Sequence, residues 1–443
     1  MLRRVRCFAS LLGLIALVGT TVPCTAIGHE RTSARASHGE AVLFAFDALD
    51  GANPSSGLIA DSNGVLYGTT GGGVGAGNAG SVYSLTPRRG GYLETVLFAF
   101  KKREQGWVPS GGLIEDASGA LYGTTVGGGR PGCKTFEDGG CGTVFKLTPS
   151  PKGYVETVLY AFTGKSDGAL PQAGLIADAG GALYGTTSAG GLSSCTAYFE
   201  ITGCGTVFKL SPSASGYTES VVYAYGGGTD GQSPWAGLIA DANGVLYGTT
   251  EFGGGSAACK SGCGAVFRLT PNGGGYTESI VHAFEGGDDG ANPLASLSAA
   301  SDGTLYGTTL AGGKPGNGTA FSLTPTPSSG GYSETVLYAF AGAAGGRPMA
   351  ALLPGAGGVL YGTASLGGSG GGGTVFALSP HGGKYTPHVF AAFQEPGQNS
   401  SGSEPSSPLI SDAAGRLYGT AYAGGSAQCG SGSGCGLVFR VAR

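Results

Sequence analysis

The sequence predicts an all-β protein, a seven-bladed β-propeller built from four-stranded blades. A ten-residue phrase typified by DANGVLYGTT, residues 241–250, occurs in seven near-copies along the 443 residues. Each interval between copies holds four short runs rich in Val, Leu, Tyr, Phe and Thr, separated by Gly, Pro, Asp or Asn turns. The last copy lacks its fourth run, and a matching run stands near the other end of the chain. Repetition at a nearly fixed period indicates a fold built from structural repeats. The fourth run of the last repeat stands at the other end of the chain, which indicates that the repeats close into a ring.

The repeat unit has four predicted strands, which we name A, B, C and D. In the second repeat these are residues 112–115 (GLIE), 120–125 (ALYGTT), 142–148 (GTVFKLT) and 154–162 (YVETVLYAF). The repeated tyrosines of strand B are Tyr67, Tyr122, Tyr184, Tyr247, Tyr306, Tyr361 and Tyr418. The seven repeats are expected to span approximately residues 57–100, 112–162, 174–225, 237–284, 296–340, 351–393 and 408–443.

The two ends of the chain predict how the ring closes. The seventh repeat supplies strands A, B and C, and its sequence ends without a strand D. Residues 40–46 (EAVLFAF) match the D run of the first repeat, residues 94–100 (ETVLFAF). We therefore expect residues 40–46 to complete the last blade, because such a strand covers sheet edges that would otherwise be exposed. An open solenoid or β-helix would need no strand to cross between the ends.

The first 26 residues have the order of a secretory signal peptide, namely basic residues, an apolar run from Phe8 to Val18, and small residues suited to cleavage after Ala26. Residues 27–39 form a short segment before a single propeller domain over 40–443.

The charge of the mature chain argues against a nucleic-acid partner, because removing Arg3, Arg4 and Arg6 with the signal peptide takes the net charge from −4 to −7. We expect an exported monomer without a membrane span in the mature chain, residing in the periplasm, at the cell surface or outside the cell.

The links between strands differ on the two faces of the ring. The A–B link is a short Asp-x-x-Gly turn in five repeats, whose aspartate is expected to bond backbone amides two residues on. Antiparallel strands alternate direction, so A–B and C–D links share one face while B–C and D–A loops share the other. The B–C and D–A loops vary in length and sequence, and function is expected on their face or at the mouth of the central channel.

Eight cysteines of the predicted domain form four local pairs, each in a B–C loop. These pairs are Cys133 with Cys141, Cys195 with Cys204, Cys259 with Cys263, and Cys429 with Cys435. Repeats one, five and six lack both members, so the two cysteines are either both present or both absent in each repeat. In an exported protein this pattern predicts four disulfides that pin loops. A zinc site is the rival interpretation, but it would have to draw pairs from separate blades.

Candidate ligand-binding residues lie in the variable loops. Flat aromatic side chains can stack on a sugar ring or anchor a protein partner. The aromatic candidates are Trp107 and Trp235 in D–A loops, and Phe136, Tyr198 and Phe252 in B–C loops. The D–A loops also repeat the pattern Asp-Gly-x-x-Pro, which offers Asp167, Asp230 and Asp289 as carboxylates that bind sugar hydroxyls or calcium. Turn formation is the plainer role of these aspartates, and packing between blades is the plainer role of Trp235.

The phrases D-x-x-G-x-LYGTT, G-T-V-F-x-L-T-P and TVLYAF together resemble the GloVer tandem repeat, the Gloeobacter and Verrucomicrobia type. The resemblance covers about residues 40–443 and implies an exported bacterial β-propeller, but it transfers no catalytic residue, metal or cofactor. We expect a binding module that recognises a polysaccharide or a surface protein. A glycan-active hydrolase or lyase with loop carboxylates at the channel mouth, and a purely structural surface protein, are the alternatives.

Overall fold

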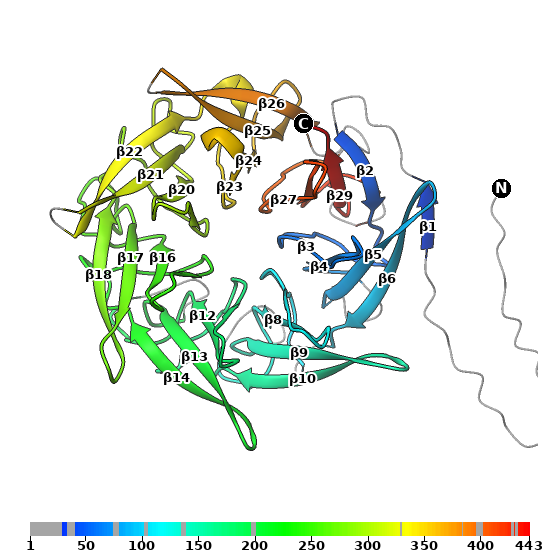
Figure 1. The fold of residues 1–443 in the computed structure, drawn as a ribbon. Helices are drawn as coiled ribbons and strands as arrows, with labels where there is room; N and C mark the ends of the chain where they lie inside the picture. Colours follow the sequence, from blue (N-terminus) through cyan, green and yellow to red (C-terminus); the bar gives the residue numbers. More distant parts are fainter. Residues whose placement is uncertain are drawn as a thin grey trace, which may run out of the picture.

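Seven antiparallel sheets are arranged as blades around a central axis in the computed structural model (Figure 1). The structure describes residues 29–32, 40–73, 79–101, 105–133, 139–195, 201–327, 330–382, 384–395, 402–426, 429 and 433–443. Within each blade, strand A lies nearest the axis and strand D is the outermost of the four repeat strands. The predicted fold, an all-β propeller of seven four-stranded blades, is confirmed.

The strands occupy equivalent positions in every blade. The A strands are β3 (Ile59–Ala60), β7 (Ile114–Glu115), β11 (Ile176–Ala177), β15 (Ile239–Ala240), β19 (Ser298–Ala299), β23 (Leu353–Pro354) and β27 (Ile410–Ser411). The B strands are β4 (Leu66–Thr70), β8 (Leu121–Thr125), β12 (Leu183–Thr187), β16 (Leu246–Thr250), β20 (Leu305–Thr309), β24 (Leu360–Ala364) and β28 (Leu417–Ala421).

The C and D strands are longer and form the outer hairpin of each blade. The C strands are β5 (Ser81–Arg88), β9 (Thr143–Ser150), β13 (Thr206–Ser213), β17 (Ala265–Pro271), β21 (Thr319–Thr326), β25 (Gly371–His381) and β29 (Leu437–Val441). The D strands are β6 (Gly91–Ala99), β10 (Gly153–Ala161), β14 (Gly216–Ala224), β18 (Tyr276–Ala283), β22 (Gly331–Ala339), β26 (Lys384–Gln394) and β2 (Glu40–Ala45). The described residues also form two short 3-10 turns, η3 (Gly342–Ala344) and η4 (Ala356–Gly358).

The ring closes as the sequence predicts. Strand β2 pairs antiparallel with β29, with Glu40 opposite Val441 and Ala45 opposite Leu437, and the blade 7 sheet runs β2-β29-β28-β27. In Figure 1 the blue β2 accordingly lies beside the red β29. Strand β1 (His29–Thr32) was not predicted, and it pairs with β6 to give blade 1 a fifth, outermost strand.

The same aromatic contact joins every pair of neighbouring blades. The aromatic residue that follows or ends strand D packs against the central aromatic residue of strand C in the next blade, with ring centroids 4.9–5.3 Å apart. The pairs are Phe46–Tyr83, Phe100–Phe145, Phe162–Phe208, Tyr225–Phe267, Phe284–Phe321, Phe340–Phe376 and Phe393–Phe439. Each of these rings is buried, so the hydrophobic core is a ring of inter-blade clusters.

The repeated LYGTT phrase is explained by packing and by hydrogen bonds. Its glycine leaves room for the strand C ring, since a Cβ atom on Gly123 would lie 2.7 Å from the Cζ atom of Phe145. Its first threonine reaches the next blade, as when the Thr124 hydroxyl donates to the Ala173 carbonyl at 2.9 Å. Equivalent bonds link Thr186 to Ala236, Thr249 to Ala295, Thr308 to Ala350, Thr363 to Ser407 and Thr420 to Ser56.

The A–B turns use their aspartates as predicted. The Asp116 carboxylate accepts hydrogen bonds from the backbone amides of Ser118 (2.8 Å) and Ala120 (3.1 Å) and from the Tyr122 hydroxyl (2.8 Å). Burial alone would raise the pKa of Asp116, but these bonds outweigh it and hold that pKa well below its usual range. The aspartates of these turns are therefore structural.

Candidate functional site

The chain reaches each A strand through a joint with the preceding blade, which sequence reasoning missed. A proline precedes each A strand, and the residue before that proline has a left-handed backbone conformation in all seven blades, with φ between 52° and 59°. These residues are Asn53, Val108, Leu170, Ser233, Asn292, Arg347 and Glu404. Each backbone amide donates to a carbonyl of the preceding blade, for example Leu170 to Cys141 at 2.9 Å and Ser233 to Cys204 at 2.8 Å. A proline before strand A in all seven repeats is the signal that could have revealed this joint.

The proline of the joint packs against a glycine of the preceding blade. A Cβ atom on Gly205 would lie 2.6 Å from the Cδ atom of Pro234, and one on Gly80 would lie 2.7 Å from that of Pro109. The predicted A strand, residues 112–115 in the second repeat, is observed only over Ile114–Glu115. Only Ile114 and Glu115 pair with strand B, while the Ser110 hydroxyl donates to the Gln172 carbonyl of the next blade at 3.0 Å.

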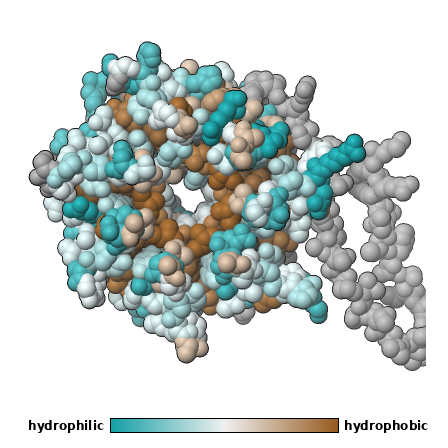
Figure 2. Space-filling view, in the orientation of Figure 1, coloured by the Kyte–Doolittle hydropathy of each residue, from teal (hydrophilic) through white to brown (hydrophobic). Residues whose placement is uncertain are grey.

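The residue that follows each proline lines the mouth of the central channel. These seven equivalent residues are Ser55, Ser110, Gln172, Trp235, Leu294, Met349 and Ser406. They share a cavity of about 310 Å³, none of their side chains is fully buried, and Figure 2 shows the central opening with hydrophobic residues around it. Because each D–A loop leads into this residue, the mouth lies on the face of the variable loops.

The channel mouth is divided into two arcs, because residues of like chemistry occupy consecutive blades. Trp235, Leu294 and Met349 of blades 4, 5 and 6 form an apolar arc. The other four positions, in blades 7, 1, 2 and 3, carry three serines and Gln172 and form a polar arc. Next to the mouth the channel is lined by small residues, where a Cβ atom on Gly174 would lie 2.9 Å from the Gly112 carbonyl oxygen. The mouth thus offers one aromatic side chain and a set of hydrogen-bonding groups.

The three candidate aspartates do not converge on the channel. Each carboxylate folds back onto its own D–A loop and strand D: Asp167 accepts from the Thr163 amide (2.8 Å) and Asp230 from the Gly226 amide (2.6 Å). Each also contacts the side chain seven residues earlier, namely Tyr160, Tyr223 or His282, at 3.0–3.1 Å. Asp289 accepts from the Glu285 amide at 2.6 Å. The hydrogen bonds of all three aspartates are those of a loop-closing turn.

A half-buried glutamate of strand D stands near each of these aspartates in the next blade. Desolvation is the main cause that raises the pKa of Glu219 to about 7, and the charge of Asp167 adds to it. The same causes raise the pKa of Glu278 (beside Asp230) and of Glu334 (beside Asp289) to about 7. One buried oxygen of each glutamate has no hydrogen-bond partner among the described residues, which suits a protonated carboxyl group.

The other aromatic candidates are placed differently from Trp235. Trp107 is only 8% exposed and belongs to a core cluster between blades 1 and 2, where its indole lies against Gly127. Phe252 is partly buried and forms a backbone bridge with Gln232. Phe136 and Tyr198 lie outside the described residues. Of the aromatic candidates that the structure describes, Trp235 alone lines the channel mouth.

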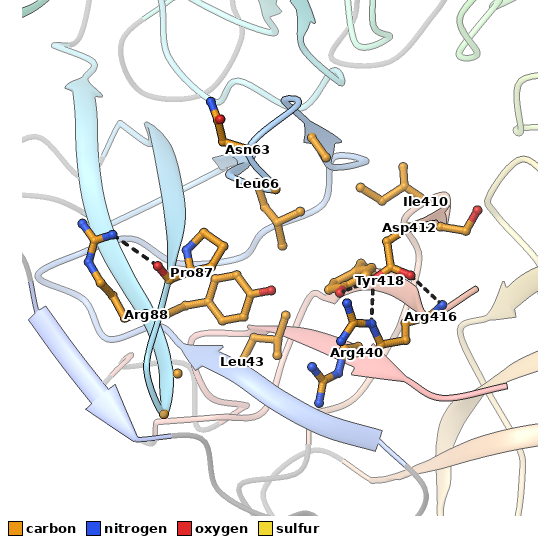
Figure 3. Close-up of a pocket in the computed structure, with 16 residues that line it drawn as sticks. Leu43, Asn63, Leu66, Pro87, Arg88, Ile410, Asp412, Arg416, Tyr418 and Arg440 are labelled. Atoms are coloured by element: carbon orange, nitrogen blue, oxygen red, sulfur yellow. Dashed lines mark hydrogen bonds and ion pairs between the residues drawn. The ribbon is translucent and has the colours of Figure 1, made fainter. Parts of the chain in front are cut away.

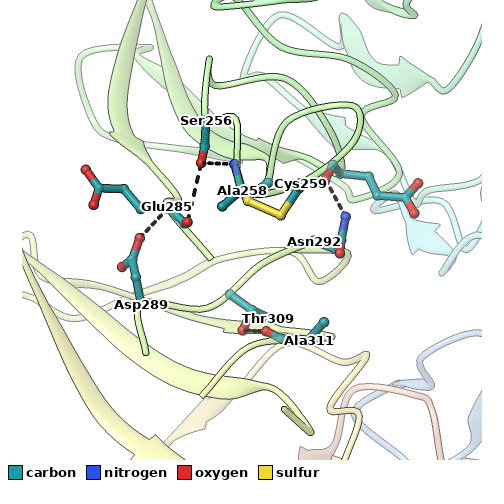
Figure 4. Close-up of a disulfide and its surroundings, with 10 residues drawn as sticks. Ser256, Ala258, Cys259, Glu285, Asp289, Asn292, Thr309 and Ala311 are labelled. Atoms are coloured by element: carbon teal, nitrogen blue, oxygen red, sulfur yellow. Dashed lines mark hydrogen bonds between the residues drawn. A yellow bond between two sulfur atoms is a disulfide. The ribbon is translucent and has the colours of Figure 1, made fainter. Parts of the chain in front are cut away.

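All eight predicted cysteines form the four predicted disulfides, Cys133–Cys141, Cys195–Cys204, Cys259–Cys263 and Cys429–Cys435. The backbone carbonyl of the second cysteine in each pair accepts a hydrogen bond from the backbone amide of the left-handed residue that leads into the next blade. Figure 4 shows the blade 4 loop, where the Ser256 hydroxyl donates to the Glu285 carbonyl at 3.3 Å beside the Cys259 disulfide. Four disulfides indicate an oxidising environment.

A groove runs between the disulfide loops of blades 3 and 4 on the same face as the channel mouth. Its volume is about 730 Å³, and its walls include Ser194, Thr229, Gln232, Ser256 and Lys260. Within the described residues, no group of three or more His, Cys, Asp or Glu side chains is placed to hold a metal ion. No helix in the described part of the chain has the length and apolarity required to span a membrane.

Comparisons with known proteins give one family and several similar solved structures. The family model described as the Gloeobacter/Verrucomicrobia repeat matches residues 32–260 and 256–443. Two candidate 6-phosphogluconolactonases are similar at 14% identity: one from Bacteroides uniformis (TM-score 0.48, covering 76% of this chain and 84% of that one) and one from Bacteroides fragilis (0.47, 79% and 86%). A Lactobacillus plantarum protein is similar at 12% identity (TM-score 0.46, covering 77% and 86%). No curated protein matches the chain.

Proposed function

Since the chain belongs to the Gloeobacter/Verrucomicrobia repeat family, we propose that it is an exported binding module that holds a glycan at the mouth of its propeller channel. The observation that carries this proposal is the division of the mouth into an apolar arc around Trp235 and a polar arc of three serines and Gln172. A sugar ring has an apolar face and a hydroxyl-bearing edge, so it matches both arcs at once.

The rigidity of the mouth supports a binding role. Its seven side chains each follow a proline, and the residue before that proline donates a backbone hydrogen bond to the preceding blade. A ligand would therefore meet a surface whose backbone is already ordered, and binding would cost little conformational entropy. The loops around the mouth are pinned by disulfides in four of the seven blades, which adds to this preorganisation.

A hydrolase that uses loop carboxylates is less well supported. Such an enzyme needs two carboxylates about 5–10 Å apart across a cleft. Asp167, Asp230 and Asp289 instead lie in three successive blades, and each is bonded to its own loop. A protein ligand at the mouth would use the same apolar arc and is kept as an outcome of the test.

The test is retention on immobilised neutral polysaccharides, with released products recorded in the same assay. The key variant is Trp235→Ser, because blades 1, 2 and 7 carry serine at this position and the fold tolerates it there. We expect Trp235→Ser to weaken retention about tenfold, as loss of an aromatic stacking contact implies. Tyr422→Ala is the matched control, since Tyr422 is an exposed loop aromatic that does not line the mouth.

Equal retention of the two variants, or no retention of any polysaccharide, would overturn the proposal and move the search to protein ligands. Release of soluble sugars by the unmodified protein would establish the hydrolase alternative instead. Product release lost in Asp230→Asn would then identify a catalytic carboxylate.

A further inference from the structure

A further cavity lies where blade 7 meets blade 1, on the face of the A–B and C–D turns and thus opposite the channel mouth. Its volume is about 550 Å³. Asn63, Leu66 and Arg88 of blade 1 line one wall, and Arg416 and Arg440 of blade 7 line the other, as Figure 3 shows. The cavity is lined by three arginines and one aspartate, Asp412, so its net charge is positive. The net charge of the whole protein, in contrast, is −4.

The repeats reveal what is unusual about Arg440. Three other blades carry a cation at the same position of strand C, and each of these cations is engaged within the protein. Lys146 forms an ion pair with Asp116 at 3.7 Å and lies over the Tyr122 ring. Lys209 lies over the Tyr184 ring, with its Nζ atom 5.1 Å from the centroid. The Arg268 Nε atom donates to the Ser279 hydroxyl at 2.9 Å, and its Nη1 atom donates to a carbonyl of blade 5.

Arg440 has no such partner, because its expected partner is taken. Asp412 is the blade 7 equivalent of Asp116, and it is bound by Arg416 through a 2.6 Å bond from the Arg416 Nε atom to the Asp412 Oδ2 atom. No other blade has an arginine at the position of Arg416. Among the described residues, the Arg440 side chain makes no hydrogen bond or ion pair. The positive charge of Arg440 is therefore available to a ligand in the cavity.

We propose that this cavity binds a small organic oxyanion, whose carboxylate or phosphate group pairs with Arg440 while its body rests on the apolar wall. A guanidinium group presents paired N–H donors that match the oxygens of carboxylates and phosphates. A partly buried position strengthens this attraction relative to one in open solvent. The apolar wall is formed by Leu43, Leu66 and Ile410, and the Tyr92 ring stands beside it.

The size and mixed lining of the cavity favour a ligand larger than inorganic phosphate. Cavities that hold metabolite-sized ligands generally measure about 300–1,000 Å³ and combine apolar walls with a few polar anchors. The site is separate from the glycan proposal, because its residues come from the opposite face and none of them lines the channel mouth.

The probes are benzoate and phenyl phosphate, which share an aromatic body and differ in the anion, with benzyl alcohol as the neutral control. Binding to the full-length mature protein is measured by isothermal titration calorimetry at low salt and again at 0.5 M NaCl. We expect at least one anion to bind tenfold or more tightly than benzyl alcohol, and the difference to shrink in high salt. Preference between the two anions identifies the oxyanion, and inorganic phosphate alone should bind more weakly than phenyl phosphate.

Two variants assign the binding to Arg440. Arg440→Ala should weaken anion binding at least tenfold, whereas Lys209→Ala, at the same strand position of blade 3, should leave it unchanged. Arg416→Val introduces a residue that blade 4 carries at this position and frees Asp412 to neutralise Arg440, so it should weaken anion binding as well.

Melting temperatures of the variants confirm that they are folded. Anion binding that survives both Arg440→Ala and Arg416→Val, equal binding of benzyl alcohol, or no binding of either anion at millimolar concentration would overturn the proposal.

Discussion

The ring of Phe46 packs against the ring of Tyr83 with 4.9 Å between centroids and an interplanar angle of 69°. Phe46 follows the strand that completes blade 7, and Tyr83 belongs to strand C of blade 1. Five of the six other inter-blade contacts are likewise edge-to-face, such as Phe162 with Phe208 at 5.1 Å and 67°, and the Phe393–Phe439 pair is tilted at 57°. The closure of the ring is therefore an ordinary inter-blade interface.

Phe46→Ala should lower the free energy of unfolding by about 3–5 kcal/mol, as expected for removing a fully buried aromatic ring. Phe162→Ala, at an interface formed by neighbouring repeats, should cost a similar amount. Leu49→Ala, at a residue that is 72% exposed, is the control and should have little effect. Chemical denaturation measures all three, and a negligible effect of Phe46→Ala would show that the closure does not contribute to stability.

Arg347→Gly should stabilise the protein. Arg347 has a φ of 52°, a conformation that costs an L-residue about 1–2 kcal/mol and costs glycine almost nothing. The greater freedom of glycine in the unfolded chain offsets part of this gain, so we expect a net increase of about 1 kcal/mol. Arg347→Ala keeps the strained backbone and should give no increase. If both variants behave alike in thermal denaturation, the backbone conformation is not the cause.

Replacing Cys195 and Cys204 together by serine should lower the free energy of unfolding by about 2–3 kcal/mol without loss of the fold. The joint to the next blade should survive, because blades 1, 5 and 6 make it without cysteine, as in the 2.9 Å bond from the Val108 amide to the Ala79 carbonyl. Circular dichroism at 25 °C and a melting curve measure the two effects separately. Loss of the β spectrum at 25 °C would contradict the prediction.

The stability of the protein should fall as the pH rises from about 4.5 to about 7. Glu219, Glu278 and Glu334 have pKa values of about 7 in the folded state, against a usual value near 4.5. Because the folded chain keeps these protons to higher pH than the unfolded chain does, their contribution is fully present below pH 4.5 and is lost through pH 7.

Glu219→Gln should therefore raise the free energy of unfolding at pH 8 by about 1 kcal/mol, a value reduced from the full pKa shift because the side chain is partly exposed to solvent. At pH 4.5 the same substitution should change little. Glu285→Gln, at an exposed loop position, is the control at both pH values. An equal effect of Glu219→Gln at pH 4.5 and pH 8 would show that Glu219 does not titrate in this range.

The repeats made much of the fold predictable. The A–B aspartates, the cysteine pairs and the closing strand at residues 40–46 are each visible in the sequence because seven copies show what is constant and what is missing. The left-handed joint was not predicted, because Asn, Val, Leu, Ser, Arg and Glu all occupy it and the usual marker, glycine, does not. Strand β1 was not predicted because it belongs to no repeat.

The candidate site was less predictable, because it depends on register and on closure. Trp107 and Trp235 lie in the same class of loop, yet Trp107 comes two residues before its proline and packs between blades, whereas Trp235 comes directly after its proline and lines the channel. The cationic cavity joins Arg88 to Arg416 and Arg440, residues that only the closed ring brings together.

The pairing of β2 with β29 also predicts an order of folding. Residues 40–45 and 437–441 form contacts at nearly the greatest sequence separation that the chain allows, and contacts of this kind form slowly. The four propeller strands of each of blades 1 to 6 are consecutive in the chain and can pair as the chain emerges, whereas β2 emerges first and stays unpaired until β29 follows. Until then the apolar EAVLFAF segment is an unpaired strand, which is the kind of segment that aggregates. The yield of folded protein should thus depend on how long that segment stays solvent-exposed during synthesis and export.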